Sequence, residues 1–384
     1  MKIAFLTDGI YPYVLGGMQR HSTNMIKHLV LNGADVTLFH AINNGCVIPS
    51  EEEVNIQLFG NQNSYRFSSV GINFPKSFQF PGHYIFNSKR YSSLVYDKLI
   101  QLNISDFDFI YVKGFSGWKL ISEKKRNRFP KIGVNFHGYE MWQYAPTLKS
   151  KFIQYMLRPF VKWNMVNSDV VFSYGSKITD LIESVGISKE NIIELPSAID
   201  KKWIRNSTIE ISDQIKFLFI GRYERRKAIE ELNQAIQQTS RLKLNMEFHF
   251  IGPIPDSKKI ISKNVIYHGK LTKSENIISI IDSCDVLMCP SFSEGMPNVI
   301  LEAMSRGLAI IATNVGAISL LVNSDNGMLI DNNVKSLLDA LIYFDNLDRK
   351  KLVELKNKSI EKVLNHFTWD IIVKDFIRKI KQIC

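Results

Sequence analysis

The apolar residues of this chain alternate between short continuous runs and longer stretches at helical spacing. The runs include KIAFLTD, ADVTLFH, FDFIYVKG and KIGVNFHG, and the stretches between them place apolar residues three or four positions apart. Short apolar runs are typical of buried strands, and helical spacing between them is typical of βα units. The chain is therefore predicted to be an α/β protein with parallel sheets.

The same alternation starts again in the second half. NIIELPSAID runs from a strand into the polar stretch DKKWIRNST, and DQIKFLFIGRYERRKAIEEL then repeats the strand, loop and helix that open the chain. The pattern predicts two Rossmann-like domains, residues 1–198 and 199–367, followed by an amphipathic helix over 368–384. Since open α/β sheets bind ligands beyond the carboxyl ends of their strands, the cleft between the domains is the predicted site.

The net charge and the cysteine content indicate which class of partner and which cellular compartment to expect. A net charge of +11 over 384 residues predicts an anionic partner, either phosphates, nucleic acid or an acidic membrane surface. No nucleic-acid recognition motif supports the second of these. The four cysteines form neither a zinc-ligand spacing nor a disulfide framework, which favours a reducing compartment. The opening run is too short for a signal peptide, so a cytoplasmic protein is expected.

Two segments of the first domain carry candidate chemistry. LGGMQRH places Gly16 and Gly17 between the first strand and its helix, where backbone N–H groups suit a phosphate; the alternative is a plain glycine turn. NFHGYE places His137 at the end of an apolar strand, where it either bonds a substrate in the cleft or is structural. The dinucleotide fingerprint G-x-G-x-x-G is absent, which disfavours a dehydrogenase.

The segment GRYERRKA concentrates cations in one loop of the second domain. It runs from Gly221 at the end of a strand into a helix and includes Arg222, Arg225, Arg226 and Lys227. Arginine grips phosphate oxygens with two parallel hydrogen bonds, and lysine adds a point charge. The loop is therefore predicted to bind phosphate. The alternative is a solvated basic loop whose cations pair with the glutamates at 224, 230 and 231.

The segment SFSEGMPNVILEAM places two carboxylates, Glu294 and Glu302, around a turn and a helix start. Carboxylate oxygens accept several hydrogen bonds and so suit the hydroxyls of a sugar or ribose. Backbone N–H groups near the helix start add further donors for hydroxyls. The alternative is a surface helix with an acidic residue near its first turn. A sugar nucleotide would use all of these segments, since it carries both phosphates and hydroxyls.

In this order, the segments resemble the retaining glycosyltransferases of family 4, which have the two-Rossmann GT-B fold. The resemblance covers nearly the whole chain. It rests on LGGMQRH, NFHG, LPSAID, GRYERRK, PSFSEGMPNVILEAMSRGLAIIATNVG with its E-x7-E signature, NGMLI and HFTW. It implies that residues 1–198 face the acceptor, that 199–367 bind the nucleotide sugar, and that the terminal helix crosses back onto the first domain.

The resemblance also implies roles for individual residues. Gly17, with Gly16 beside it, would contact the donor diphosphate, and Arg222 and Lys227, in the loop that starts at Gly221, would neutralise it as it departs. The backbone at Leu271 would hold the base. Glu302 would bind the ribose. The transferred sugar would be bound by His137, by Glu294 and by the turn of Gly295, Met296, Pro297 and Asn298. No metal or other cofactor is implied, because cations and helix dipoles take that place.

Within that resemblance, the donor is expected to be a UDP- or GDP-sugar and the acceptor a glycan or a lipid-linked molecule, in cell-surface polysaccharide synthesis. Retention is ascribed in the family to front-face attack, with the leaving phosphate helping to deprotonate the acceptor. Two departures concern the donor side. Ala228 replaces a usual glycine, and in NVGAISLLV Ala317, Ser319 and Leu320 replace a usual second glycine and Pro-Glu pair. The alternatives are a GT-B nucleotide-sugar epimerase and an inactive nucleotide-sugar-binding protein.

A basic and aromatic stretch within KFIQYMLRPFVKW bears on the acceptor. Lys151, Arg158 and Lys162 share one predicted helical face, and Phe152, Tyr155 and Trp163 lie on another. Such faces suit an anionic membrane surface. The first domain is therefore expected to dock on the inner membrane leaflet, with an ordinary core helix and snorkelling cations as the alternative.

Overall fold

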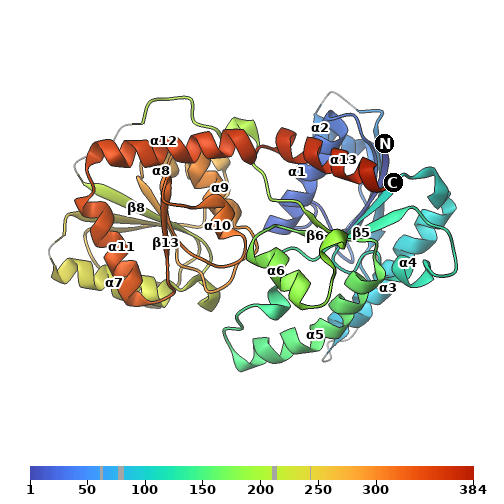
Figure 1. Ribbon diagram of the computed structural model, residues 1–384, viewed down its shortest axis with the longest axis horizontal. Helices are drawn as coiled ribbons and strands as arrows, with labels where there is room; N and C mark the ends of the chain where they lie inside the picture. The colour runs from blue at the N-terminus through green and yellow to red at the C-terminus, as the bar shows by residue number, and fades with distance from the viewer. Residues whose placement is uncertain (61–63, 77–81, 210–213, 243) are drawn as a thin grey trace.

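The computed structural model describes residues 1–60, 64–76, 82–209, 214–242 and 244–384. Two parallel sheets lie beside each other along the long axis of the molecule, and helices cover both faces of each (Figure 1). The predicted α/β fold with two Rossmann-like domains is confirmed.

The first sheet contains seven strands in the order β3-β2-β1-β4-β5-β6-β7. In the described part of the chain these are β1 (Lys2–Thr7), β2 (Asp35–Ile42), β3 (Phe67–Asn73), β4 (Phe109–Lys113), β5 (Lys131–Asn135), β6 (Val170–Ser173) and β7 (Ile192–Glu194). Its helices are α1 (Gly17–Leu31), α2 (Glu51–Phe59), α3 (His83–Gln101), α4 (Trp118–Glu123), α5 (Leu148–Asn167) and α6 (Lys177–Ser184). Because both faces are covered, the central strands are largely apolar and buried along their length, as β4 shows with five buried residues.

The second sheet repeats the arrangement with six strands in the order β10-β9-β8-β11-β12-β13. In the described part these are β8 (Ile215–Ile220), β9 (Met246–Ile251), β10 (Val265–Gly269), β11 (Val286–Cys289), β12 (Ala309–Thr313) and β13 (Gly327–Ile330). Its helices are α7 (Ile229–Arg241), α8 (Ser274–Asp282), α9 (Asn298–Ser305), α10 (Ile318–Leu321), α11 (Val334–Asn346) and α12 (Arg349–His366). The strand order reverses next to the strand that opens each sheet, and ligands bind at such a switch point.

The chain crosses between the domains twice, and the two crossings lie against each other. The first runs from β7 to β8, and the predicted boundary at residues 198 and 199 lies within it. The second joins α12 to the last helix, α13 (Trp369–Ile383). The N–H of Ile199 donates to the carbonyl of Phe367 (2.9 Å), and the N–H of Trp369 donates to the carbonyl of Ile199 (3.2 Å).

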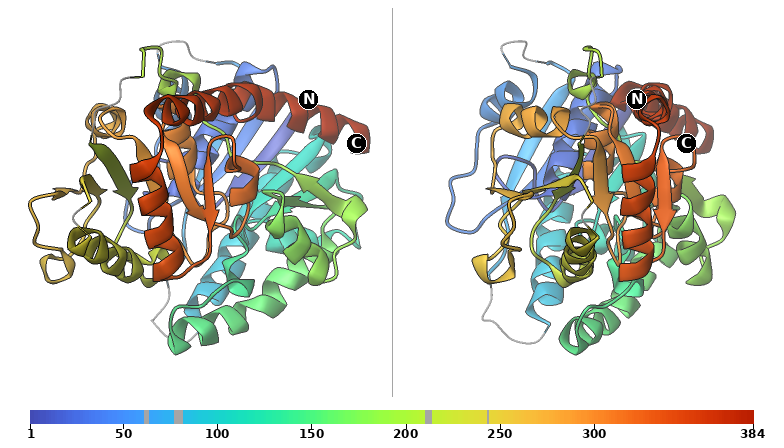
Figure 2. Two further views of the ribbon diagram at one scale, coloured as in Figure 1. Left: turned by 60° about the vertical axis from the view of Figure 1, so that its left-hand side comes forward. Right: turned by 90° about the vertical axis from the view of Figure 1, so that its left-hand side faces the viewer.

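Helix α13 packs on the first domain, beside α1 (Figure 2). Its buried face, which includes Trp369 and Phe376, joins the apolar cluster formed by β1, β2 and α1. The Trp369 side chain is 2% exposed, and its ring stacks on His28 with centroids 5.9 Å apart. The last helix therefore ties the end of the second domain to the first.

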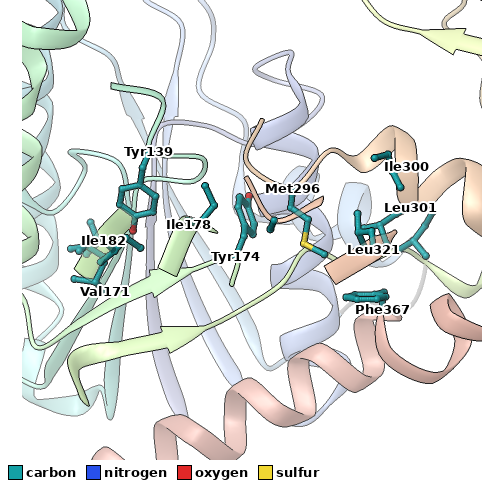
Figure 3. Packing of buried hydrophobic residues seen from close by; sticks show 14 of the residues in the cluster. Tyr139, Val171, Tyr174, Ile178, Ile182, Met296, Ile300, Leu301, Leu321 and Phe367 are labelled. Atoms are coloured by element: carbon teal, nitrogen blue, oxygen red, sulfur yellow. The ribbon is translucent and has the colours of Figure 1, made fainter. Parts of the chain in front are cut away.

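A continuous apolar cluster joins the two domains. Tyr139 and Tyr174 belong to the first domain, Met296 and Leu301 to the second, and Phe367 to the second crossing (Figure 3). The inner edges of the two sheets are thus held together by burial, which stabilises one relative placement of the residues at their carboxyl ends.

Candidate active site

The carboxyl ends of the two sheets meet at a close backbone contact. A Cβ added to Gly138, just after β5, would lie 2.9 Å from the Cα of Gly295, just after β11. Beside it, Nε2 of Gln143 donates to the carbonyl of Glu294 (2.8 Å). This approach needs glycine on both sides, because any side chain would fill the gap. The loops that carry His137 and Glu294 are thereby adjacent.

Glu294 is buried and held by two cations of the GRYERRKA loop. Its side chain accepts from Nζ of Lys227 (2.5 Å) and from Nη1 of Arg226 (3.4 Å), and the residue is 6% exposed. The N–H of Phe292 also donates to the carbonyl of Arg226 (2.7 Å), which fixes the two loops to each other. A buried carboxylate is stable only when paired in this way. Lys227 and Arg226 are cations that could bind another anion in place of the Glu294 carboxylate.

The other two arginines of the loop pair with carboxylates other than Glu294. Nη2 of Arg222 lies 2.8 Å from a carboxylate oxygen of Glu224, with the Arg222 side chain 73% exposed. Arg225 forms a two-pronged pair with Glu231 at 2.9 and 2.7 Å and lies over the Phe292 ring. The structure therefore brings Lys227 to Glu294 but leaves Arg222 paired with Glu224 in solvent. Arg226, predicted only as one of the cations of this loop, is the arginine next to Glu294.

Glu302 lies on α9, in a pocket of about 220 Å³ between the domains. Arg20 of α1 lines the same pocket, as do Asn298 and Thr272. Burial raises the pKa of Glu302 to about 6, and the charge of Arg20 acts in the opposite direction. The pocket therefore combines a carboxylate of one domain with a cation of the other. Thr272 follows Leu271, so the predicted position for the base adjoins it.

The turn before α9 is fixed by the first crossing. The N–H of Ser197 lies 3.0 Å from Sδ of Met296, and the Ser197 hydroxyl donates to Oδ1 of Asn298 (2.8 Å). Pro297 occupies the residue before the helix. The side chains of Met296 and Asn298 are thus held by contacts within the protein, which leaves the backbone of this turn as the part that can contact a ligand.

The first-domain side of the cleft carries His137. Its N–H donates to Oδ1 of Asn135 (2.7 Å), and its Nδ1 lies 2.7 Å from the hydroxyl of Tyr174. Burial, with the nearby charges of Lys113 and His21, lowers the pKa of His137 well below 6.5. The ring is therefore neutral near pH 7 and can exchange hydrogen bonds with a sugar hydroxyl.

A buried lysine lies beneath the start of α1. Nζ of Lys113, 1% exposed, donates to the Ser22 hydroxyl (2.8 Å) and lies 3.2 Å from Nδ1 of His21. Burial lowers the pKa of Lys113 to about 7, against the attraction of Asp8. Helix α1 begins at Gly17, with Gly16 before it, so its first N–H groups lack intrahelical partners. Lys113 thus supports the turn predicted to meet a diphosphate.

Sequence reasoning missed the residues that act through distant contacts. Tyr174, His21, Lys113 and Arg20 were not assigned roles, and Arg226 was predicted only as one cation of the phosphate-binding loop. Local signals were present: Lys113 ends a strand and Tyr174 directly follows one, so both lie at the carboxyl edge of the sheet, and Arg20 and His21 lie within LGGMQRH. The sequence did not indicate which of these side chains would meet. Gly221 directly follows β8, at the strand end where it was predicted, and its N–H donates to the carbonyl of Ile251 (2.9 Å).

The two halves of the chain each match a known family. Residues 15–203 match "Glycosyltransferase Family 4", and residues 214–344 match "Glycosyl transferases group 1". The fold is shared with sucrose-phosphate synthase from Thermosynechococcus elongatus, with a TM-score of 0.75 at 17% identity over 100% of this chain and 98% of that one. Two facing Rossmann-like domains of this kind, with a cationic loop and two carboxylates at the cleft, define a GT-B glycosyltransferase.

More specifically, the chain belongs to the family 4 and group 1 glycosyltransferases. An uncharacterized glycosyltransferase of Methanocaldococcus jannaschii is 24% identical over 97% of this chain and 95% of its own length. A putative teichuronic acid biosynthesis glycosyltransferase of Bacillus subtilis is 29% identical over 35% of this chain and 33% of its own length. An Escherichia coli UDP-Gal:alpha-D-GlcNAc-diphosphoundecaprenol alpha-1,3-galactosyltransferase is 36% identical over 28% of this chain and 27% of its own length.

Proposed function

We propose that this glycosyltransferase moves a sugar from a nucleotide-diphosphate donor, with retention, to a glycan or lipid-linked acceptor during cell-surface polysaccharide synthesis. The observation that carries the proposal is the buried pairing of Lys227 and Arg226 with Glu294, next to the loop of His137. Two relatives support the acceptor class, one named for teichuronic acid biosynthesis and one for transfer to a diphosphoundecaprenol-linked sugar.

The donor is proposed to lie across the cleft. Its diphosphate meets Lys227, Arg226 and the first N–H groups of α1, which together stabilise the charge on the leaving group without a metal or other cofactor. As the diphosphate enters, it takes over cations that otherwise pair with Glu294. The freed carboxylate is then available to the hydroxyls of the transferred sugar. Glu302 accepts from the ribose.

Neutral His137 completes the proposed sugar subsite. Tyr174, at 2.7 Å from its Nδ1, orients the ring, so that the other ring nitrogen is available to a sugar hydroxyl. With no charge to compete for the departing diphosphate, the ring positions the sugar while the cations of the second domain stabilise the leaving group. The acceptor approaches from the first domain.

The test is a thermal-shift screen against UDP-, GDP- and ADP-sugars, followed by NMR of the product. A donor that binds the native state raises the unfolding temperature. Lys227→Ala should abolish that shift, whereas Lys358→Ala, which removes an exposed lysine paired with Glu361, should preserve it. A product formed without acceptor would instead indicate an epimerase. Binding without any product would indicate an inactive binding protein, and an inverted anomeric centre would contradict retention.

Attachment to an anionic membrane surface is part of the proposal. No helix among the described residues has the length and apolarity to span a bilayer. The first half of α5 nevertheless exposes large apolar residues, with Leu148 at 86%, Phe152 at 64% and Tyr155 at 66%, beside exposed lysines at positions 149 and 151. Such a surface suits the interface of an anionic leaflet. Failure to co-sediment with phosphatidylglycerol vesicles at low salt would remove this element.

A further inference from the structure

A single side-chain amide joins the loop of His137 (residues 137–144) to the loop of Glu294 (residues 291–297). Nε2 of Gln143 donates to the carbonyl of Gly138 and also to the carbonyl of Glu294, the latter at 2.8 Å. A glutamine amide nitrogen carries two hydrogens, so this bridge uses both. The reversed amide would place Oε1 against two carbonyl oxygens, which fixes its orientation. Gln143 therefore sets the spacing of the two loops.

The His137 loop is held firmly by its own domain. The hydroxyl of Tyr139 donates to the carbonyl of Phe172 in β6 (2.6 Å). Nε of Arg158 in α5 donates to the carbonyl of Met141 (2.8 Å). His137 and Tyr139 have φ angles of 58° and 52°, which residues with side chains keep only where surrounding contacts hold them. The loop thus reaches the other domain from a fixed base.

The Glu294 loop is fixed in the second domain in the same way. The N–H of Phe292 donates to the carbonyl of Arg226 (2.7 Å), and the N–H of Ala317 donates to the carbonyl of Gly295 (2.8 Å). Beside the amide bridge, the ring of Tyr144 stacks on that of Phe292, with centroids 4.6 Å apart and planes at 20°. Two loops with fixed bases therefore meet at the bridge and at this stack.

The bridge lies beside the proposed sugar subsite and apart from the nucleotide subsite. Gln143 is not among the described residues that line the pocket of Glu302. Lys227 reaches the Glu294 carboxylate from within the second domain. The contacts proposed for the ribose and the diphosphate are thus independent of the bridge. The placement of His137 relative to Glu294 depends on it, and small misplacements of reacting groups slow an enzyme strongly.

We propose that Gln143 is a positioning residue for sugar transfer. Its amide holds His137 at the distance from Glu294 at which both contact the transferred sugar. The inference rests on the proposed function, which places that sugar between the two residues. A bond that only stabilised the loop could stay within the first domain, whereas one hydrogen of this amide goes to the other domain, 151 residues away in the chain.

The kinetic test compares Gln143→Leu and Gln143→Glu with the wild type. The probe is the UDP-, GDP- or ADP-sugar with the largest thermal shift, and turnover is the release of its nucleoside diphosphate, with water in place of the acceptor. Both variants should lower kcat by about 10- to 100-fold, while KM for the donor stays within about twofold. The matched control is Gln57→Glu, at an exposed position of α2, which should behave as the wild type.

Gln143→Glu adds a readout that loop stability alone would not change. Its ionised carboxylate has no hydrogen for either carbonyl, whereas its protonated form donates one. One restored hydrogen bond should raise kcat of Gln143→Glu, relative to Gln143→Leu, by about fivefold between about pH 8 and about pH 5.5. The ratio cancels the titration of the surrounding groups, which both variants share: His137, Glu140, Tyr144, Glu294, Arg225 and Arg226.

Hydrogen exchange tests the bridge without a substrate. In Gln143→Leu the amides of Phe292 and Ala317, both hydrogen-bonded in the second domain, should exchange about fivefold faster, while those of β1 keep their wild-type rates. Unchanged exchange at both amides, wild-type kcat in Gln143→Leu, or parallel pH profiles of the two variants would each overturn the inference. Absence of any nucleotide-sugar thermal shift in the wild type would instead refute the proposed function, and the exchange result would still report on the bridge.

Discussion

Replacing Glu302 by glutamine should stabilise the protein while impairing donor binding. The carboxylate pays a burial cost in the pocket it lines, which raises its pKa from 4.5 to about 6. One pKa unit corresponds to about 1.4 kcal/mol, so the cost at full ionisation is at most about 2 kcal/mol, and less where pocket water reaches the oxygens. Glutamine keeps the shape but carries no charge and so avoids this cost.

The pH dependence of that gain follows from the two states of the carboxyl group. Below pH 4.5 it is protonated in both the folded and the unfolded chain, and the cost is absent. Between pH 4.5 and about 6 the unfolded chain ionises first, so stability falls as the pH rises, and above about 6 the cost is complete. Glu302→Gln should therefore raise the free energy of unfolding by about 2 kcal/mol at pH 8 and by less than half of that at pH 5.

Urea unfolding at pH 5 and pH 8 measures this difference, and Glu190→Gln, at an exposed carboxylate, is the matched control. Donor affinity should move in the opposite direction. A hydrogen bond to a charged group contributes about 1.5–3 kcal/mol, so loss of the ribose contact should weaken binding by roughly tenfold or more. A stability gain that is absent at pH 8, or equal at both pH values, would show that Glu302 is not a destabilising buried charge.

Three further changes test other parts of the structure. Glu294→Ala and Lys227→Ala should each lower donor turnover by about 100- to 1,000-fold with an unchanged circular dichroism spectrum; near-normal turnover in both would reject the site. Gly138→Ala should block the approach to Gly295, which lies 2.9 Å from the added Cβ, and so abolish transfer while nucleotide binding persists; wild-type turnover would show that this contact is dispensable. Trp369→Ala should cost about 3–5 kcal/mol in urea unfolding, since its side chain is 2% exposed, and a loss under about 1 kcal/mol would contradict that packing.

Local patterns were sufficient for the fold and for the segments of the site. Strands such as β1 and β8 are apolar because helices cover both faces of each sheet, so their periodicity was visible in the sequence. The restart of that pattern predicted two similar sheets. The positions of Gly17, Lys227 and Glu294 next to strand ends or helix starts followed from the same reading, since the carboxyl edge of a parallel sheet collects ligand-binding residues.

Which side chains meet was decided only by the tertiary structure. Arg222 and Arg226 look equivalent in GRYERRKA, yet only Arg226 reaches Glu294, which lies 68 residues away in the chain. The contact of Lys113 with His21 joins residues 92 positions apart. Such pairings depend on how whole elements pack, and the sequence around either partner carries no trace of the other.

An aromatic groove formed by α3, α4 and α5 shows the same division. Phe160 and Trp163 are visible in the sequence as part of one amphipathic helical stretch, whereas Trp118 belongs to α4. Only the packing of α3 and α4 beside α5 turns that stretch into a trough with Lys89 at its rim. Periodicity reports which face of an element is apolar, because that depends on neighbours in the chain. Whether that face is buried, exposed or shaped into a binding site depends on distant segments and is settled when they pack.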